Sequence, residues 1–303
     1  MGPSIESIEI RHLRYFLAVA QTENFTRAAE RLQISQPSIS QQITQLEKML
    51  GTPLFRRVGK RVFLTEAGVA FRVRAEIVLR KLEEACSSVN DVGTLLSGRV
   101  DIGVIPALHV PWVPPVIESL ARDFPGLTVG VREAASSAVE SEIEAGRVDL
   151  GFGLMTRTSP NIRYERLASE PFSLIVPAQG KFGSSAGIAL RDIQGERLVL
   201  LPQSFDMRGA ADAVLMQAGV HPRIAFEIDS IDSTLAAVER TGMPTLLPAL
   251  VLRGRSSTKL RAIPIRDRTR RMEFGLLWPA ASAPDPAGLE VAKALKAMLK
   301  SLD

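Results

Sequence analysis

Apolar residues recur at spacings of three and four through most of the first hundred residues, which is typical of amphipathic helices. The pattern predicts three helices that follow one another closely, over residues 10–21, 26–32 and about 36–50. Thr26 and Ser35 stand where a side chain can cap the second and third helices, and Pro37 fits a first helical turn. Two helices joined by so short a break indicate a helix-turn-helix.

The third helix has two unlike faces. Ile39, Ile43, Leu46 and Leu50 share an apolar face, and the opposite face has no charge before Glu47. Uncharged amides and hydroxyls can donate to and accept from base edges in a DNA major groove. We therefore expect this helix to read DNA through the following residues: Gln36, Pro37, Ser38, Ser40 and Gln41.

A basic hairpin is predicted directly after this helix. The run PLFRRVGKRVFL holds two short strand-like segments around Val58-Gly59-Lys60, with four cations and no acid. A hairpin of this kind suits DNA phosphates or the minor groove, with Arg57, Lys60 and Arg61 as the contacts. Either feature alone is more often ordinary protein surface, and their combination favours DNA binding.

Residues 65–96 read as one long helix. Its apolar residues alternate spacings of four and three over more than three heptads, which favours a dimer seam over packing on its own domain. The seam positions are Phe71, Ala75, Val78, Leu82, Ala85, Val89, Val92 and Leu96. Two glycines and a serine within 93–99 indicate a hinge after it.

From residue 100 the pattern changes to alternating strands and helices, which predicts an α/β fold with parallel sheets covered by helices. The expected strands are 100–104, 127–133, 149–154, 172–177, 197–202, 224–228, 245–248, 260–265 and 272–278. The expected helices are 111–122, 136–145, 206–218, 230–240 and 286–302.

Composition adds mainly exclusions. A net charge of +4 over 303 residues is modest, so the position of the charges carries more information than their sum. Cys86 is the single cysteine, which rules out an intrachain disulfide and fits a cytoplasmic protein. His12, His109 and His221 are isolated, and no catalytic motif is present, so we expect no metal, no cofactor and no enzymatic activity. No apolar run is long enough to span a membrane.

The N-terminal residues also resemble a known family. The pattern AA-x-x-L-x-x-SQP-x-x-S-x-QI-x-x-LE-x-x-LG-x-x-LF-x-R is similar to the N-terminal signature of LysR-type transcriptional regulators. Within that family, LVLLPQSFDMR and ERTGMPTLLPA are most similar to the cyanate-responsive regulators.

The resemblance implies an N-terminal winged helix-turn-helix at 8–65, a dimerisation helix and hinge at 66–97, and an effector domain at 98–303. That domain would have two lobes, like a periplasmic binding protein, with lobe I at 98–171 and 269–303 and lobe II at 172–268. The chain would cross between the lobes near 169–173 and 268–274. The implied partners are promoter DNA, a small-molecule inducer, a second copy through the linker helix, further copies to a homotetramer, and RNA polymerase.

The same resemblance implies an effector site between the lobes, for a small molecule that we expect to be anionic. Ser136 stands where relatives place a ligand-binding hydroxyl, and Arg208 could grip a carboxylate. Ala107 replaces a hydroxyl that many relatives carry. The expected lining is Ala107, His109, Ser136, Gln203, Ser204, Phe205 and Arg208. The alternative is that Ser136 only caps its helix and that Arg208 pairs with Asp206 or Asp212.

Two rival functions stay open on the sequence alone. One is a solute-binding or enzymatic α/β protein with an accessory N-terminal domain. The other is a nucleoid-type DNA binder that needs no effector. A preference for one DNA site in the presence of competitor DNA would separate a regulator from a non-specific binder.

Overall fold

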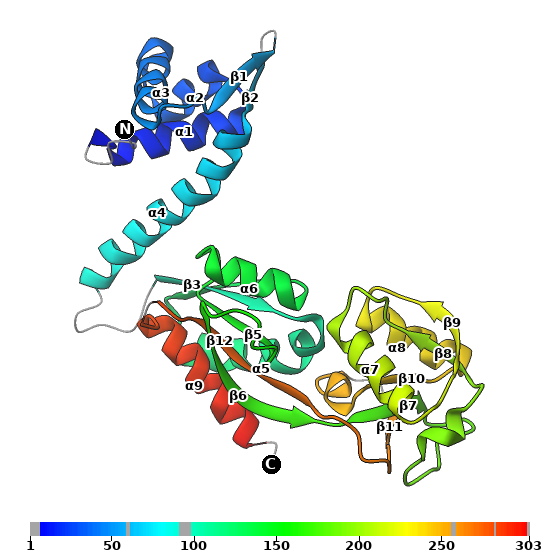
Figure 1. Ribbon diagram of the computed structural model, residues 1–303. Coiled ribbons are helices and arrows are strands. Elements are labelled where there is room, and N and C mark those ends of the chain that lie inside the picture. Colours follow the sequence, from blue (N-terminus) through cyan, green and yellow to red (C-terminus); the bar gives the residue numbers. More distant parts are fainter. Residues whose placement is uncertain (1–6, 59–60, 91–97, 256–258, 282, 302–303) are drawn as a thin grey trace. The chain divides into compact units, whose positions relative to one another are not determined.

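The structure is a computed structural model that describes residues 7–58, 61–90, 98–255, 259–281 and 283–301. The chain forms two compact units, Met1–Thr94 and Leu95–Asp303, and each is described by itself (Figure 1). No helix in the described residues is long and apolar enough to cross a lipid bilayer.

The first unit is a winged helix. Its elements are α1 Ile10–Thr22, α2 Phe25–Leu32, α3 Gln36–Leu50, β1 Phe55–Val58, β2 Arg61–Leu64 and α4 Glu66–Asn90. The ring of Phe16 lies at the centre of its core, 5.3 Å from the Phe55 ring and 5.0 Å from the Phe71 ring. This aromatic cluster ties α1, the wing and α4 into one body.

Two details of this unit differ from the sequence prediction. The cap of α2 is Asn24 and not Thr26, because the Asn24 side chain accepts hydrogen bonds from the backbone N–H groups of Thr26 and Arg27. The long helix begins at Glu66 and is described to Asn90, so the expected hinge lies mostly outside the described residues. Thr65 caps α4 by accepting from the Gly68 N–H.

The second unit contains two lobes. The first lobe consists of β3 Gly98–Val104, α5 Pro106–Asp123, β4 Leu127–Glu133, α6 Ser136–Glu144, β5 Leu150–Leu154, β6 Ile162–Glu170, β12 Met272–Pro279 and α9 Pro286–Lys300. Its sheet has the order β4-β3-β5-β12-β6. Helices α6 and α9 lie on opposite faces of this sheet (Figure 1). Close packing requires glycine in β5, since a Cβ on Gly151 would lie 2.8 Å from Val139.

The second lobe is built on two smaller sheets. Its elements are β7 Phe172–Pro177, η2 Leu190–Ile193, β8 Arg197–Leu200, α7 Asp206–Gln217, β9 Arg223–Glu227, α8 Ile231–Thr241, β10 Thr245–Pro248, η3 Ala249–Leu252 and β11 Leu260–Pro264. The sheets have the orders β10-β7-β11 and β8-β9. The chain passes between the lobes at Pro171 and again within residues 265–271.

The sheets are mixed, so the prediction of purely parallel sheets was wrong. β3 pairs in parallel with β4 and β5, whereas β12 is antiparallel to β5 and β6, and β7 is antiparallel to β10 and β11. The double crossing between the lobes explains the antiparallel pair of β6 and β12. β6 leaves the first lobe and β12 returns to it, so these two strands run side by side in opposite directions.

Helix α5 begins five residues earlier than expected. Residues 105–109 were expected to be a loop after the first strand, but residues 106–109 form the first turn of α5. Pro111, Pro114 and Pro115 lie inside this helix. The early start of α5 places its N-terminus at the boundary between the lobes.

Candidate functional site

The outer face of α3 is the first candidate site. Ile39, Ile43 and Leu46 are buried and fix this helix against the core of the first unit. Gln36, Pro37 and Gln41 are exposed, and Ser38 and Ser40 are partly exposed. A shallow surface groove follows this face, lined by Gln36, Pro37, Ser40, Gln41, Thr44, Gln45 and Lys48. Four of the five predicted DNA-contacting residues of α3 therefore line one accessible groove, whereas Ser38 is partly exposed outside its lining.

Glu47, the first acidic residue of α3, does not line the groove. Its side chain accepts hydrogen bonds from the backbone N–H groups of Leu54 (2.8 Å) and Phe55 (3.1 Å). The carboxylate thus holds the start of the wing against the end of α3. No sequence pattern indicates this role, because the contact spans a turn.

The wing is the antiparallel pair β1–β2, with Arg57 opposite Val62 and Val58 opposite Arg61. Arg56 and Arg61 are exposed, and the Arg56 guanidinium lies over the Phe63 ring at 5.3 Å. The side chain of Arg57 and all of Lys60 lie outside the described residues. A cationic hairpin therefore adjoins the uncharged face of α3, as the sequence predicts for a winged DNA-binding module.

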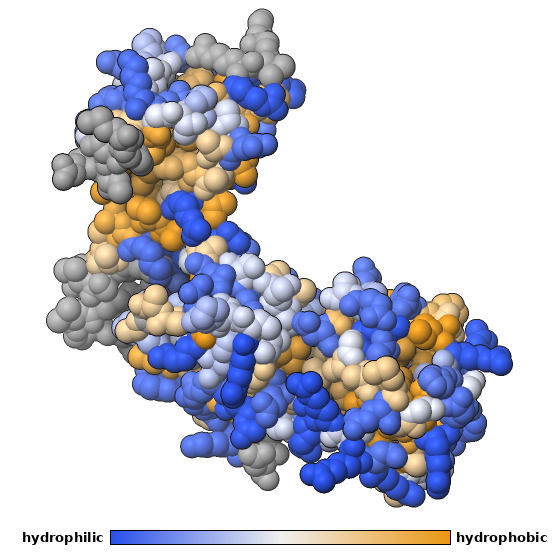
Figure 2. All heavy atoms as spheres, viewed as in Figure 1, coloured by the Kyte–Doolittle hydropathy of each residue, from blue (hydrophilic) through white to orange (hydrophobic). Residues whose placement is uncertain are grey.

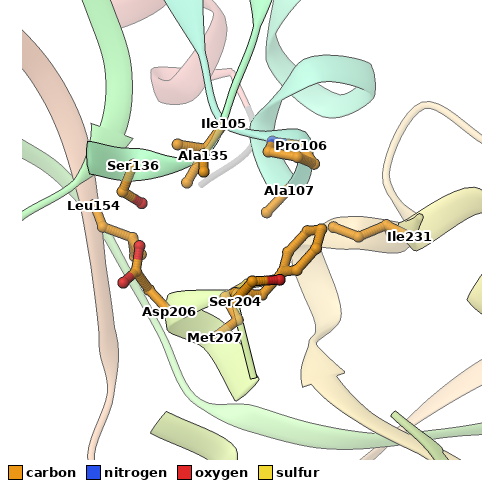
Figure 3. A pocket seen from close by; sticks show the side chains of 11 residues that line it. Ile105, Pro106, Ala107, Ala135, Ser136, Leu154, Ser204, Asp206, Met207 and Ile231 are labelled. Carbon is orange, nitrogen blue, oxygen red and sulfur yellow. The ribbon is translucent and has the colours of Figure 1, made fainter. Parts of the chain in front are cut away.

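The second candidate site is a cavity between the two lobes (Figure 3). Its volume is about 30 Å³. This is room for about two to three water molecules, or for one small molecule. Its lining comes from the starts of four helices and the end of β5: Ile105, Pro106, Ala107, Ala135, Ser136, Leu154, Ser204, Phe205, Asp206, Met207 and Ile231.

Four of the seven predicted effector residues line this cavity: Ala107, Ser136, Ser204 and Phe205. Ser136 is the first residue of α6 and is 9% exposed, and its hydroxyl points into the cavity (Figure 3). The structure does not bring His109, Gln203 or Arg208 to the lining.

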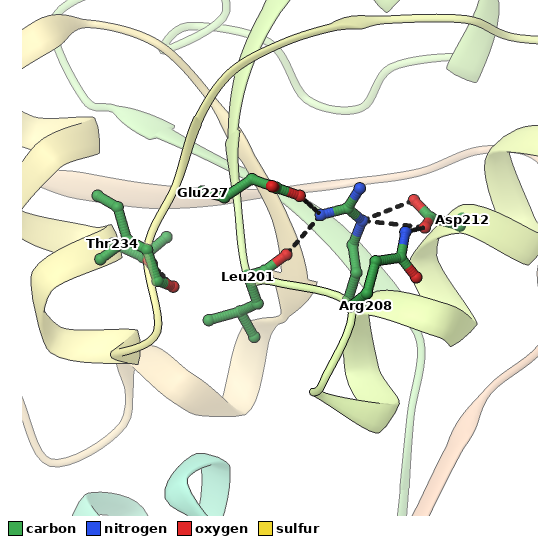
Figure 4. Close-up of polar contacts among 7 residues, drawn as sticks. Leu201, Arg208, Asp212, Glu227 and Thr234 are labelled. Atoms are coloured by element: carbon green, nitrogen blue, oxygen red, sulfur yellow. Dashed lines mark hydrogen bonds and ion pairs between the residues drawn. The ribbon is translucent and has the colours of Figure 1, made fainter.

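Arg208 is buried inside the second lobe (Figure 4). Its Nη1 donates to the Leu201 carbonyl (2.6 Å) and to Glu227 (2.5 Å), and its Nε lies 2.9 Å from the Asp212 carboxylate. Burial opposes the charge on the guanidinium, but hydrogen bonds to Glu227 and then Asp212 outweigh it and raise the pKa of Arg208. These contacts join α7 to β9 and to Leu201, the residue after β8, and they engage Nε and Nη1 of the guanidinium.

The other two predicted residues also have partners elsewhere. His109 Nδ1 lies 2.5 Å from a carboxylate oxygen of Glu133, at the exposed end of β4. Gln203 donates from Nε2 to Asp212 (2.9 Å) and so adds to the group around Arg208.

Asp206 is the residue that sequence reasoning missed. It is the first residue of α7, and its carboxylate lies at the cavity across from Ser136 (Figure 3). Its only sequence signal is its position at the start of a predicted helix. A favourable interaction with the helix dipole explains an acid at that position equally well.

Glu140 anchors the helix that carries Ser136. It lies one turn further along α6, is 8% exposed, and accepts hydrogen bonds from the hydroxyls of Thr156 (2.6 Å), Thr158 (2.8 Å) and Tyr164 (2.8 Å). These contacts connect α6 to the end of β5 and to the crossing strand β6. They fix the position of the Ser136 hydroxyl.

Other chemistry finds little support in the described residues. No group of three His, Cys, Asp or Glu side chains there could hold a metal ion. Cys86 is exposed on α4.

Comparisons with known proteins agree with this two-part organisation. Residues 10–69 match the family "Bacterial regulatory helix-turn-helix protein, lysR family", and residues 93–300 match "LysR substrate binding domain". The chain is 30% identical over 243 residues to a hydrogen peroxide-inducible genes activator of Pectobacterium carotovorum subsp. carotovorum, covering 80% of each protein. It is 30% identical over 260 residues to a probable cat1 operon transcriptional activator of Acinetobacter lwoffii, covering 84% of this chain and 86% of that protein.

Solved structures show the same fold. A full-length OxyR variant from Pseudomonas aeruginosa has a TM-score of 0.72 at 22% identity, with 95% of each chain covered. CbnR, a LysR family transcriptional regulator, has a TM-score of 0.68 at 22% identity, with 96% of this chain and 99% of that chain covered. With its winged helix, its two-lobed unit and family matches over both, the chain belongs to the LysR family of DNA-binding transcriptional regulators with an effector-binding domain.

Proposed function

We propose that α3 reads the major groove of promoter DNA and that the wing binds the adjoining phosphates. The observation that carries this proposal is the accessible face of α3 with five uncharged contact residues, Gln36, Pro37, Ser38, Ser40 and Gln41. Gln and Ser can read bases, whereas Arg57, Lys60 and Arg61 would add affinity that is independent of sequence. The proposed DNA-binding region is 8–65, followed by a linker at 66–97 and the effector region at 98–303.

We propose that α4 pairs two copies of the chain. The first seam positions expected from the sequence have another role, because Phe71 packs on Phe16 and Ala75 is 1% exposed inside the first unit. Further along, Val78 is 51% exposed, and Leu82 and Ala85 fall on the same side of the helix. Hydrophobic residues gather over α4 (Figure 2), and exposed apolar residues at this spacing support a helix–helix contact.

A homotetramer would need a second contact, for which we propose the outer side of the second lobe. Three apolar side chains are exposed there: Met216 at 75% on α7, and Ile224 at 48% and Phe226 at 47% on β9. RNA polymerase as a partner and a cytoplasmic location belong to the same proposal, since both follow from action at a promoter.

We propose that the cavity between the lobes holds the effector, with lobe I at 98–171 and 269–303 and lobe II at 172–268. Ser136, Ser204, Phe205 and Ala107 stay in the proposed site, and Asp206 joins them. His109, Gln203 and Arg208 lie outside the lining and bind other residues. Relatives are named for induction by hydrogen peroxide, but this chain has no cysteine after Cys86. Thiol oxidation in the effector region is therefore not the mechanism.

The likeness to cyanate-responsive regulators rests only on LVLLPQSFDMR and ERTGMPTLLPA, and the compared relatives do not add to it. We propose no catalytic role, since the compared relatives are regulators. The second candidate is a DNA binder that needs no effector. It predicts that no ligand changes the DNA affinity of the chain.

Selection from a random pool of double-stranded DNA with the full chain tests this function. We expect one motif with two half-sites, separated by whole helical turns of about 34–36 Å. Enrichment of no motif in the presence of competitor DNA would contradict the proposal.

A further inference from the structure

The two walls of the cavity have opposite electrical character. On the first-lobe wall, the residue Ser136 is nine-tenths buried, and its hydroxyl points into the cavity and has no hydrogen bond with any other described residue (Figure 3). A hydroxyl that faces a cavity without a protein partner takes its hydrogen-bond partner from a molecule in that cavity. This hydroxyl therefore indicates a polar ligand atom on its side of the cavity.

Two helix starts next to Ser136 strengthen this interpretation. The N-cap positions of α5 and α6 are Ile105 and Ala135, whose side chains cannot cap, although Ser, Thr, Asp and Asn are preferred there. In the described structure, the backbone N–H groups of Ser136 and Ser137 have no hydrogen-bond acceptor. Free N–H groups at a helix start attract negative charge, so the first-lobe wall is suited to a carboxylate.

The second-lobe wall carries the opposite charge. Asp206 is the only charged side chain in the cavity lining. Asp206 is exposed, and within the described residues its carboxylate makes no hydrogen bond and no ion pair; it lies near Leu154 and Ser136 (Figure 3). A carboxylate at the first position of α7 also offsets the positive end of that helix. This wall is therefore suited to a cation that donates hydrogen bonds.

Resting on the proposed effector role of this cavity, we propose that the ligand is a small zwitterion, namely an α-amino acid of about the size of glycine or alanine. Its carboxylate binds Ser136 Oγ and the free N–H groups at the start of α6. Its ammonium group binds Asp206. The small side chain meets the apolar lining, which includes Leu154 next to Asp206 (Figure 3).

Simpler ligands satisfy only one wall. A plain carboxylic acid would fit Ser136 but would face the Asp206 carboxylate without a group to neutralise it. A plain amine would pair with Asp206 but would face the positive starts of α5 and α6. Only a molecule that carries both charged groups on one carbon atom matches both walls of so small a cavity.

Calorimetric titration of the full chain tests this inference with three compounds of similar size: L-alanine, propionate and ethylamine. We expect L-alanine to bind at least 10-fold more tightly than the other two. Asp206→Asn should weaken L-alanine at least 10-fold and strengthen propionate, since the repelling charge is gone. Ser136→Ala should weaken both L-alanine and propionate.

Asp123→Asn is the matched control, because it removes one carboxylate at the far end of α5, where Asp123 pairs with Arg122. This variant should bind all three compounds as the parent does, and thermal unfolding should show all variants folded. Propionate binding at least as tightly as L-alanine would overturn the inference, as would binding of none of the three. An unchanged L-alanine affinity in Asp206→Asn would also overturn it.

The DNA affinity of the parent, measured with and without each compound, separates this inference from the proposed function. If propionate binds best and shifts DNA affinity, the effector cavity stands and the zwitterion is wrong. If L-alanine binds as expected and DNA affinity does not change, the ligand class stands and the effector role is wrong.

Discussion

Replacing Arg208 by alanine should damage the fold of the second lobe and leave the cavity lining in place. The guanidinium is 4% exposed and has three partners: the Leu201 carbonyl, Asp212 and Glu227. If Arg208 instead gripped the effector, the same change would weaken ligand binding and leave the ligand-free protein stable. The two roles therefore predict opposite results in one variant.

The size of the loss follows from the exposure of the partners. The side chains of Asp212 and Glu227 are 36% and 48% exposed, so water replaces much of what they lose. The discount leaves roughly 0.5–1 kcal/mol for each ion pair, and the Leu201 carbonyl in its buried hydrogen bond costs about 1–2 kcal/mol when orphaned. We expect a total loss of about 2–4 kcal/mol, which lowers the unfolding midpoint by about 4–16 °C for a unit of roughly 200 residues.

Thermal unfolding of the full chain, followed by circular dichroism, measures this loss. Arg122→Ala is the matched control, because its side chain is 71% exposed and pairs only with the neighbouring Asp123 in the described structure. That change should stay within about 0.5 kcal/mol. An Arg208→Ala midpoint equal to that of the control would refute the structural role.

Three further predictions concern other parts of the molecule. Glu47→Ala should cost about 1–3 kcal/mol, because the Leu54 and Phe55 N–H groups lose their acceptor; Glu47→Gln should recover part of it in thermal unfolding, and equal losses would argue against the hydrogen bonds. Val78→Asp with Leu82→Asp should reduce the assembly measured by light scattering, because carboxylates would enter an apolar contact; an unchanged mass would exclude this seam. A hydrogen bond from Arg147, with a smaller Coulombic contribution, lowers the pKa of Glu142. The stabilisation is therefore present above the ordinary value of about 4.3 and is lost as the pH falls through the lowered value. Unfolding at pH 7 and pH 3 should show Glu142→Gln losing less stability on acidification than the parent, and equal losses would contradict the assignment.

The sequence predicted most of the first unit because its signals are local. The apolar face of α3, its cap at Ser35 and the strands of the wing each depend on residues close in the chain. The role of Glu47 was missed because it depends on how the wing folds back on α3. The use of Phe71 and Ala75 was also missed, since a heptad pattern does not say which partner covers it.

The second unit was harder to predict for a similar reason. β6, with the sequence IRYERLASE, is a sheet edge with mostly half-exposed residues, so it lacks a strong apolar signal. Asp206 and Arg208 are two residues apart in α7, so they point to nearly opposite sides of the helix. Only the packing of α7 on β8 and β9 decides that the aspartate faces the cavity and that the arginine faces the interior.

The central claim is that α3 reads base sequence and that the wing binds phosphates. The most direct measurement is the salt dependence of affinity for a selected DNA site and for a scrambled site, in the parent, Gln36→Ala and Arg61→Ala. Gln36→Ala should lose about 1–3 kcal/mol on the selected site only. Arg61→Ala should weaken both sites alike and reduce the salt slope by about one. If Gln36→Ala bound the selected site as tightly as the parent, or weakened both sites equally, α3 would not be the element that reads the sequence.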